Sequence, residues 1–101
     1  MKVSVTPLAE LDIESIGDRI AEFSPMRAYT YVRELRAHCT RIGEFPHAGP
    51  PRPQWGKDIR ITVHGVYIIV HRVREDTLQI LRVVHGARDL DRLFADEPIA
   101  E

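Results

Sequence analysis

The chain has 101 residues, of which 44% are hydrophobic and 29% are charged, and its formal net charge is −1. This length suits one domain with a single core, and the composition is that of a globular protein rather than a disordered one. No apolar run approaches the roughly 18 residues of a membrane span, and the N-terminus has no long hydrophobic segment of the secretory kind. Cys39 is the single cysteine, which excludes an internal disulfide. We therefore expect a cytoplasmic protein without membrane association, whose one domain covers 1–101, with its core over about 1–95 and an acidic tail over 96–101.

The charge is distributed unevenly along the chain. Residues 51–88 hold seven Lys and Arg against three Asp and Glu, a net charge of +4, together with three of the five histidines. Residues 89–101 hold one against five, a net charge of −4. The basic block suits an anionic partner, either nucleic acid or an acidic peptide, although its excess is smaller than that of a dedicated nucleic-acid binder.

Two helices are predicted in the first half of the chain, after a short strand in which Val3 and Val5 alternate with polar residues up to Pro7. Thr6 and Ser24 each precede a proline, a combination typical of a helix N-terminus. The apolar positions at helical spacing are Ala9, Ile13, Ile16 and Ile20 in the first helix, which runs to about Phe23, and Ala28, Val32, Leu35, Cys39 and Ile42 in the second, which ends at Gly43. The two helices should pack as an antiparallel hairpin. The acidic side chains of the first helix would then face outward: Glu10, Asp12, Glu14, Asp18 and Glu22.

Three strands are predicted after a Pro-rich connector over 45–53. Two-residue turns at His64-Gly65 and Glu75-Asp76 would join them as antiparallel hairpins. This pairing sets Val63 opposite Val66, Ile61 opposite Ile68 and Val70 opposite Leu81, all on the face that the helices cover. The other face collects Arg60, Thr62, Tyr67, Ile69, His71 and Arg82. The predicted fold is α+β, in the order β-α-α-β-β-β, with a helical hairpin packed on one face of a small, mainly antiparallel four-stranded sheet.

The run Leu81–Asp89 is the candidate functional segment. It places two guanidiniums, those of Arg82 and Arg88, and the imidazole of His85 at the end of an apolar strand. Because an arginine within a half-buried strand needs an anion or a carboxylate, Arg82 is expected to pair with Asp58 or with the acidic tail. His85 suits either a cap on the strand end or a general base. Arg88 is the strongest candidate for contact with a partner.

These elements, with the sequences Tyr67–Val73 and Leu81–Asp89 and with Phe45-Pro46 and Gly49 in the connector, resemble the ParE/RelE superfamily of toxins from bacterial type II toxin–antitoxin systems, which includes plasmid stabilisation proteins. The match covers nearly the whole chain and depends on the order and spacing of several motifs, none of which is highly specific alone. The resemblance implies a small protein that blocks growth when free. It also implies a cognate antitoxin that neutralises the toxin by lying along its surface as helix and extended segments.

The superfamily has two branches with different chemistry. The RelE branch cleaves mRNA on the ribosome and needs a general base, cations on the phosphate and an acid for the leaving oxygen, whereas the ParE branch poisons DNA gyrase and needs none of these. Lys57, Arg60 and Arg88 fit the nuclease pattern, but Ile68 stands where a nuclease often has Arg, Phe94 stands in the approximate place of its C-terminal Tyr, and His71 stands where many relatives have Tyr. The ending His85–Asp89 looks more like the ParE branch.

The resemblance therefore favours a gyrase inhibitor without catalysis. The alternatives are a ribosome-dependent mRNA endonuclease and a degenerate, non-toxic family member that binds its antitoxin. If the chain is a nuclease, the catalytic candidates are Arg60, Arg82, His85 and Arg88. The candidates for binding the target or the antitoxin are Arg60, Tyr67, Ile69, His71, Arg82, Val84, His85 and Arg88.

The antitoxin site is expected to be a groove on the open face of the sheet. Ile69, Ile80 and Val84 would line it between Arg60 and Arg82, which suits an amphipathic segment that offers carboxylates. The histidines lack metal-ligand spacing and Cys39 lies on an apolar stripe, so we expect no metal and no cofactor. The structural alternatives are packing for Trp55 and Tyr67, a strand-surface position for His64 and His71, and capping of a final helical turn by Asp89.

Overall fold

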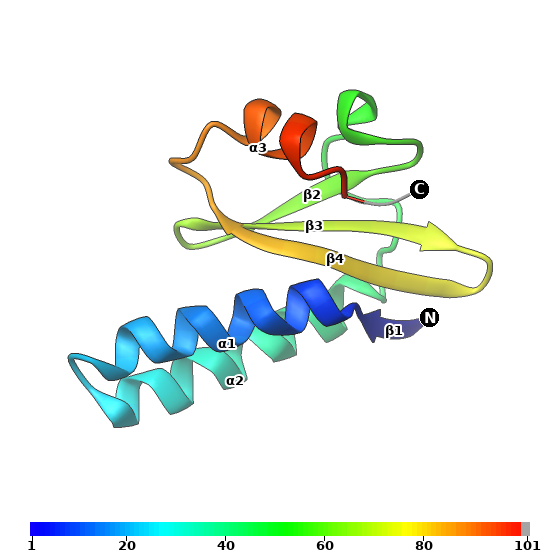
Figure 1. Cartoon of the computed structure of the whole chain (residues 1–101). Coiled ribbons are helices and arrows are strands. Elements are labelled where there is room, and N and C mark those ends of the chain that lie inside the picture. The colour runs from blue at the N-terminus through cyan, green and yellow to red at the C-terminus, as the bar shows by residue number, and fades with distance from the viewer. Residues whose placement is uncertain (100–101) are drawn as a thin grey trace.

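Helices cover both faces of one four-stranded sheet (Figure 1). The computed structural model describes residues 1–99, so the end of the predicted acidic tail, 100–101, lies outside the described residues. The elements are β1 (Lys2–Val5), α1 (Pro7–Ala21), α2 (Pro25–Ile42), the 3₁₀ helix η1 (Pro53–Trp55), β2 (Arg60–His64), β3 (Tyr67–Arg74), β4 (Thr77–His85) and α3 (Leu90–Asp96). The sheet order is β1-β4-β3-β2, with β1 parallel to β4 and the other pairs antiparallel. The predicted α+β fold and the element order β-α-α-β-β-β are confirmed, and the structure adds η1 and extends the final helical turn to the seven-residue α3.

Side-chain caps define the start of both long helices. The Thr6 hydroxyl accepts a hydrogen bond from the Ala9 N–H at 3.2 Å, and the Ser24 hydroxyl accepts one from the Arg27 N–H at 3.1 Å. A proline follows each cap at the first helical position, where its missing N–H costs no hydrogen bond. The Thr6 hydroxyl also donates to the Leu81 carbonyl at 3.1 Å, which ties the start of α1 to β4. These caps confirm the predicted helix starts.

The hairpin of α1 and α2 packs on one face of the sheet and buries the larger apolar cluster (Figure 1). Both predicted helical stripes contribute to it, and Ile13 and Leu35 are almost completely buried. The buried members of this hairpin-side cluster are Ala9, Ile13, Ile16, Leu35, Cys39, Ile42, Tyr67, Ile69, Leu78, Ile80 and Val83. The α3-side cluster on the opposite face consists of Ile59, Ile61, Val70, Leu81, Val84, Leu93, Phe94 and Ile99. Because Ile99 belongs to it, the packed core continues past residue 95.

The sequence prediction placed the wrong face of the sheet under the hairpin. Ile61 and Val70 face α3, whereas Tyr67 and Ile69 lie beneath the hairpin. The division of residues between the two faces was largely right. However, a sheet covered on both sides has apolar residues on both faces, so alternation cannot show which face the longer helices cover.

Two details of the strand register also differ from the prediction. Gly65 and Val66 form the β2–β3 turn, so Val63 pairs with Ile68 rather than with Val66. Gly65 has a φ of 60°, which fits the first central position of a tight hairpin turn. On the other side of β3, Val70 pairs with Arg82 and the next residue along pairs with Ile80, so the sheet has a bulge at this point. A bulge redirects the side chains next to it.

Candidate functional site

Arg82 is held by an acidic side chain of α1. Its Nε donates to Asp12 Oδ2 at 2.8 Å and its Nη2 to Asp12 Oδ1 at 3.1 Å, and the Val83 N–H donates to the same Oδ2 at 2.9 Å. Arg82 Nη1 also lies 3.6 Å from Glu97 Oε1. Its hydrogen bonds to Asp12 raise the pKa of the Arg82 guanidinium. Arg82 is 7% exposed, which leaves it little contact with a partner.

This ion pair corrects two predictions. Asp12 was expected to face outward, and Arg82 was expected to pair with Asp58 or the tail, of which only the tail residue Glu97 contributes. One feature of the sequence indicated that Asp12 is partly buried: it is adjacent to the buried stripe residue Ile13 on α1. The partner itself was not predictable, since 70 residues separate Asp12 from Arg82.

The proposed antitoxin groove of Ile69, Ile80 and Val84 does not exist on the surface. Ile69 and Ile80 are completely buried under the hairpin, and Val84 is buried in the α3-side cluster. Tyr67 is also buried, with its ring against that of His85 at a centroid distance of 5.6 Å. A partner cannot reach Ile69 and Ile80 in this conformation, so these two side chains can only support a binding surface from below.

His71 is a buried histidine rather than a strand-surface residue. Its exposed fraction is 0%, and its Nε2 lies 2.8 Å from the Thr62 hydroxyl. Burial lowers the pKa of His71 to about 4, with a further contribution from the positive charge of Arg60. The ring is therefore neutral at pH 7 and contributes to packing between β2, β3 and the hairpin.

His64 is also paired rather than free on the strand surface. Its Nδ1 lies 2.7 Å from the Nδ1 of His38 on α2, so one ring must donate and the other accept. Partial burial lowers the pKa of both rings. Among residues 1–99, no three His, Cys, Asp or Glu side chains are arranged to hold a metal ion.

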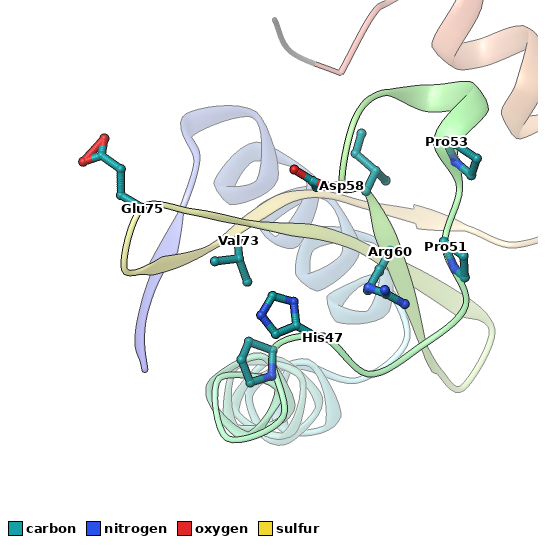
Figure 2. Close-up of a pocket in the computed structure, with 9 residues that line it drawn as sticks. His47, Pro51, Pro53, Asp58, Arg60, Val73 and Glu75 are labelled. Atoms are coloured by element: carbon teal, nitrogen blue, oxygen red, sulfur yellow. The ribbon is translucent and has the colours of Figure 1, made fainter.

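Arg60 lies in a cleft of its own, away from Arg88. It donates to the Gly49 carbonyl at 2.8 Å and lines a hollow of about 520 Å³ formed with the Pro-rich connector. Figure 2 shows Arg60 beside Pro51, with Glu75 pointing away at the β3–β4 turn. Arg60 pairs in register with His71, whereas His85 pairs with Tyr67 nearer the other end of β3. The four catalytic candidates therefore do not converge.

The loop after β4 brings His85 and Arg88 together. His85 Nδ1 accepts from the Ala87 N–H at 3.0 Å, and the Arg88 N–H donates to the His85 carbonyl at 3.2 Å. The Asp89 side chain accepts from the Arg92 N–H at 3.2 Å and caps α3, which was the structural alternative for this residue. The loop is thus internally hydrogen-bonded, and the Arg88 side chain is exposed on it.

Arg88 borders two clefts. The α1 cleft has a volume of about 530 Å³ and is lined by Asp12, Ser15, Ile16, Arg19, Tyr67, Val83, Val84, His85 and Arg88. The η1 cleft has a volume of about 370 Å³ and is lined by Arg52, Gln54, Trp55, Ile61, Ile68, Gly86, Arg88, Asp89, Leu90 and Asp91. The fold thus places four predicted site residues together at the α1 cleft: Tyr67 and Val84, which are mostly buried, and His85 and Arg88, which are more exposed.

The η1 cleft has an apolar base. Ile61 and Ile68 line it, and Ile68 packs against the same α3-side cluster that contains Phe94. Trp55 packs edge-on against Phe94 at a centroid distance of 4.9 Å and donates its Nε1–H to Asp91 at 2.6 Å. The two positions at which the sequence departs from the nuclease pattern, Ile68 and Phe94, therefore belong to one apolar cluster.

Comparisons with known proteins agree with this architecture. The family model for the ParE toxin of the type II toxin–antitoxin system, parDE, matches residues 3–90, so the chain belongs to this family. A chain of the solved chromosomal ParDE TA system from P. aeruginosa has the same fold, with a TM-score of 0.73 and 22% sequence identity. That match covers 84% of this chain and 95% of the other. No curated protein matches the sequence, and no helix among residues 1–99 is long and apolar enough to cross a membrane.

Proposed function

We propose that this ParE-family toxin stops growth by poisoning DNA gyrase, and that a cognate antitoxin neutralises it. The observation that carries the proposal is the packing of Ile68 and Phe94 in one apolar cluster. Neither side chain can hold a phosphate or transfer a proton, whereas cleavage of mRNA needs both functions. Poisoning of gyrase requires binding to a protein–DNA complex, and this chain has accessible cations for such contact.

The scatter of the four catalytic candidates supports the same proposal. Arg82 is held by Asp12, Arg60 lies in the connector cleft, and only His85 and Arg88 share a cleft. In the η1 cleft, Asp89 caps α3 and Asp91 accepts from Trp55, so both carboxylates have structural partners. A gyrase inhibitor would act in the cytoplasm, which is the location we propose.

The test is a paired assay of purified toxin. We expect gyrase to lose supercoiling activity and to accumulate cleaved DNA, while mRNA in a translating extract stays intact. Normal supercoiling together with discrete mRNA cuts would assign the chain to the nuclease alternative. Antitoxin binding without either effect would indicate the non-toxic alternative.

The variant Arg88→Ala sharpens the test, because Arg88 is exposed and its side chain can contact the target. We expect weaker inhibition of gyrase with unchanged thermal stability. Arg33→Ala is the matched control, since Arg33 is also exposed but lies on α2 and lines neither cleft that Arg88 borders. Equal inhibition by both variants would exclude Arg88 from target contact.

A further inference from the structure

The α1 cleft has unpaired cations on two of its sides. Arg19, in the last turn of α1, and Arg88, on the loop after β4, are both exposed and both line it. Neither guanidinium has a hydrogen bond or an ion pair with any residue in 1–99. Two other exposed arginines are paired, Arg36 with Glu10 and Arg27 with Glu34. The α1 cleft is therefore a place where positive charge lacks an internal partner.

The carboxylate in this cleft is already paired, because the charge of Asp12 is balanced by that of Arg82. Asp12 Oδ2 accepts from the Arg82 Nε and from the Val83 N–H, and its Oδ1 accepts from the Arg82 Nη2. The ion pair of Arg82 and Asp12 is partly buried and bidentate. Charge-assisted hydrogen bonds in such pairs are among the stronger kinds. The acceptors in the cleft are thus occupied while the donors remain available.

His85 adds a further donor. Its Nδ1 accepts from the Ala87 N–H at 3.0 Å, so the proton of the neutral ring is on Nε2. The exposed Ser15 hydroxyl is another donor on the α1 side of the cleft. The available polar groups therefore favour an anion, while Ile16, Val83 and Val84 supply an apolar lining.

The carboxylates around the α1 cleft favour a ligand with a single negative charge over a polyanion. Asp18 on α1 and Glu22, the residue that follows the helix, are exposed near Arg19 at helical spacing from Ser15. Asp89 and Asp91 are exposed on the far side of Arg88. A nucleic-acid backbone crossing the cleft would meet these carboxylates on both sides, whereas one carboxylate on an apolar peptide would not.

We propose that the α1 cleft binds an Asp or Glu side chain of the antitoxin, carried on a segment that is otherwise apolar, with Arg19 and Arg88 on either side of the carboxylate. This inference depends on the proposed function only in taking the antitoxin as the partner. It replaces the predicted groove of Ile69, Ile80 and Val84, and it adds Arg19 and Ser15 to the binding residues.

The test uses the 101-residue chain and, as the probe, the product of whichever small reading frame adjoins its gene. The dissociation constant is measured for the wild type, for Arg19→Gln, for Arg88→Gln and for the double variant. We expect about a tenfold weaker complex for each single variant and a larger loss for the double variant, because each removes a charge-assisted contact. Arg33→Gln, the matched control on α2, should change binding less than about twofold. Thermal unfolding checks that the variants are folded.

A scan of the Asp and Glu residues in the probe identifies the partner carboxylate. One substitution to Gln or Asn should weaken binding to the wild type but not to Arg88→Gln, since the contact is already lost there. Unchanged affinity of the double variant would overturn the inference while leaving the antitoxin proposal intact. If the double variant lost binding only to a DNA duplex, nucleic acid would be the ligand instead. Failure of the wild type to bind the probe would overturn both the inference and the antitoxin proposal. The gyrase proposal is tested independently, by the supercoiling assay.

Discussion

The two faces of the sheet are covered in different ways. The hairpin-side cluster lies under two helices of 15 and 18 residues, both with side-chain caps and a proline at the first position. The α3-side cluster lies under a helix of seven residues and the short η1 segment. Short helices have little stability of their own and depend on packing. We therefore expect the hairpin face to be the more stable part of the core and the α3 face to open locally.

The largest expected effect is on the ion pair that joins α1 to β4. Asp12→Ala should lower the free energy of unfolding by about 3–5 kcal/mol, because it leaves the buried guanidinium of Arg82 without its main partner. Glu10→Ala is the matched control, since the pair of Glu10 with Arg36 is exposed and should contribute less than about 1 kcal/mol. Urea unfolding measures both. Similar losses in the two variants would show that burial does not distinguish these pairs.

The next prediction compares the two apolar clusters directly. Leu35→Ala, on the hairpin face, should cost about 3 kcal/mol, because a completely buried leucine leaves a cavity between long helices. Leu93→Ala, on α3, should cost about 2 kcal/mol, since a seven-residue helix can move to fill the space. Urea unfolding gives both values. A larger loss for Leu93→Ala would reverse the ranking of the two faces.

The stability of the hairpin side should also depend on pH. The pKa of His71 falls to about 4 in the folded protein from its ordinary value of 6.5, so folding favours the neutral ring. This contribution is present above pH 6.5 and is lost as the pH falls from 6.5 toward about 4, with a total of about 3 kcal/mol. His71→Gln should flatten the pH dependence measured by urea unfolding. His47→Gln, at an exposed histidine, should leave it as in the wild type.

The smallest effect concerns the α3 face alone. Trp55→Phe removes the Nε1–H that donates to Asp91, which should cost about 1 kcal/mol. Amide hydrogen exchange should become faster in α3, while the amides of α1 and α2 keep their protection. Equal acceleration in all three helices would mean that the two faces unfold together and that α3 is not a separate cover.

Local sequence patterns were enough for the elements and for part of the site. The capping residues Thr6 and Ser24 marked both helix starts, and the helical stripes identified the residues that meet the sheet. The pattern also found the loop of His85 and Arg88, because a short apolar strand followed by His-Gly-Ala-Arg is a local feature. The assignment of sheet faces failed, since alternation contains no information about which face the longer helices cover.

Residues close together in the chain were enough to predict the order of elements, the helix caps and the position of a cationic loop after β4. The fold of the whole chain was needed to show that Asp12 holds Arg82, that His71 is buried and neutral, and that Arg19 and Arg88 line the same cleft. These relations join residues up to 70 positions apart. They arise from the packing of the hairpin against the sheet and from the bulge in β4, which no local pattern encodes.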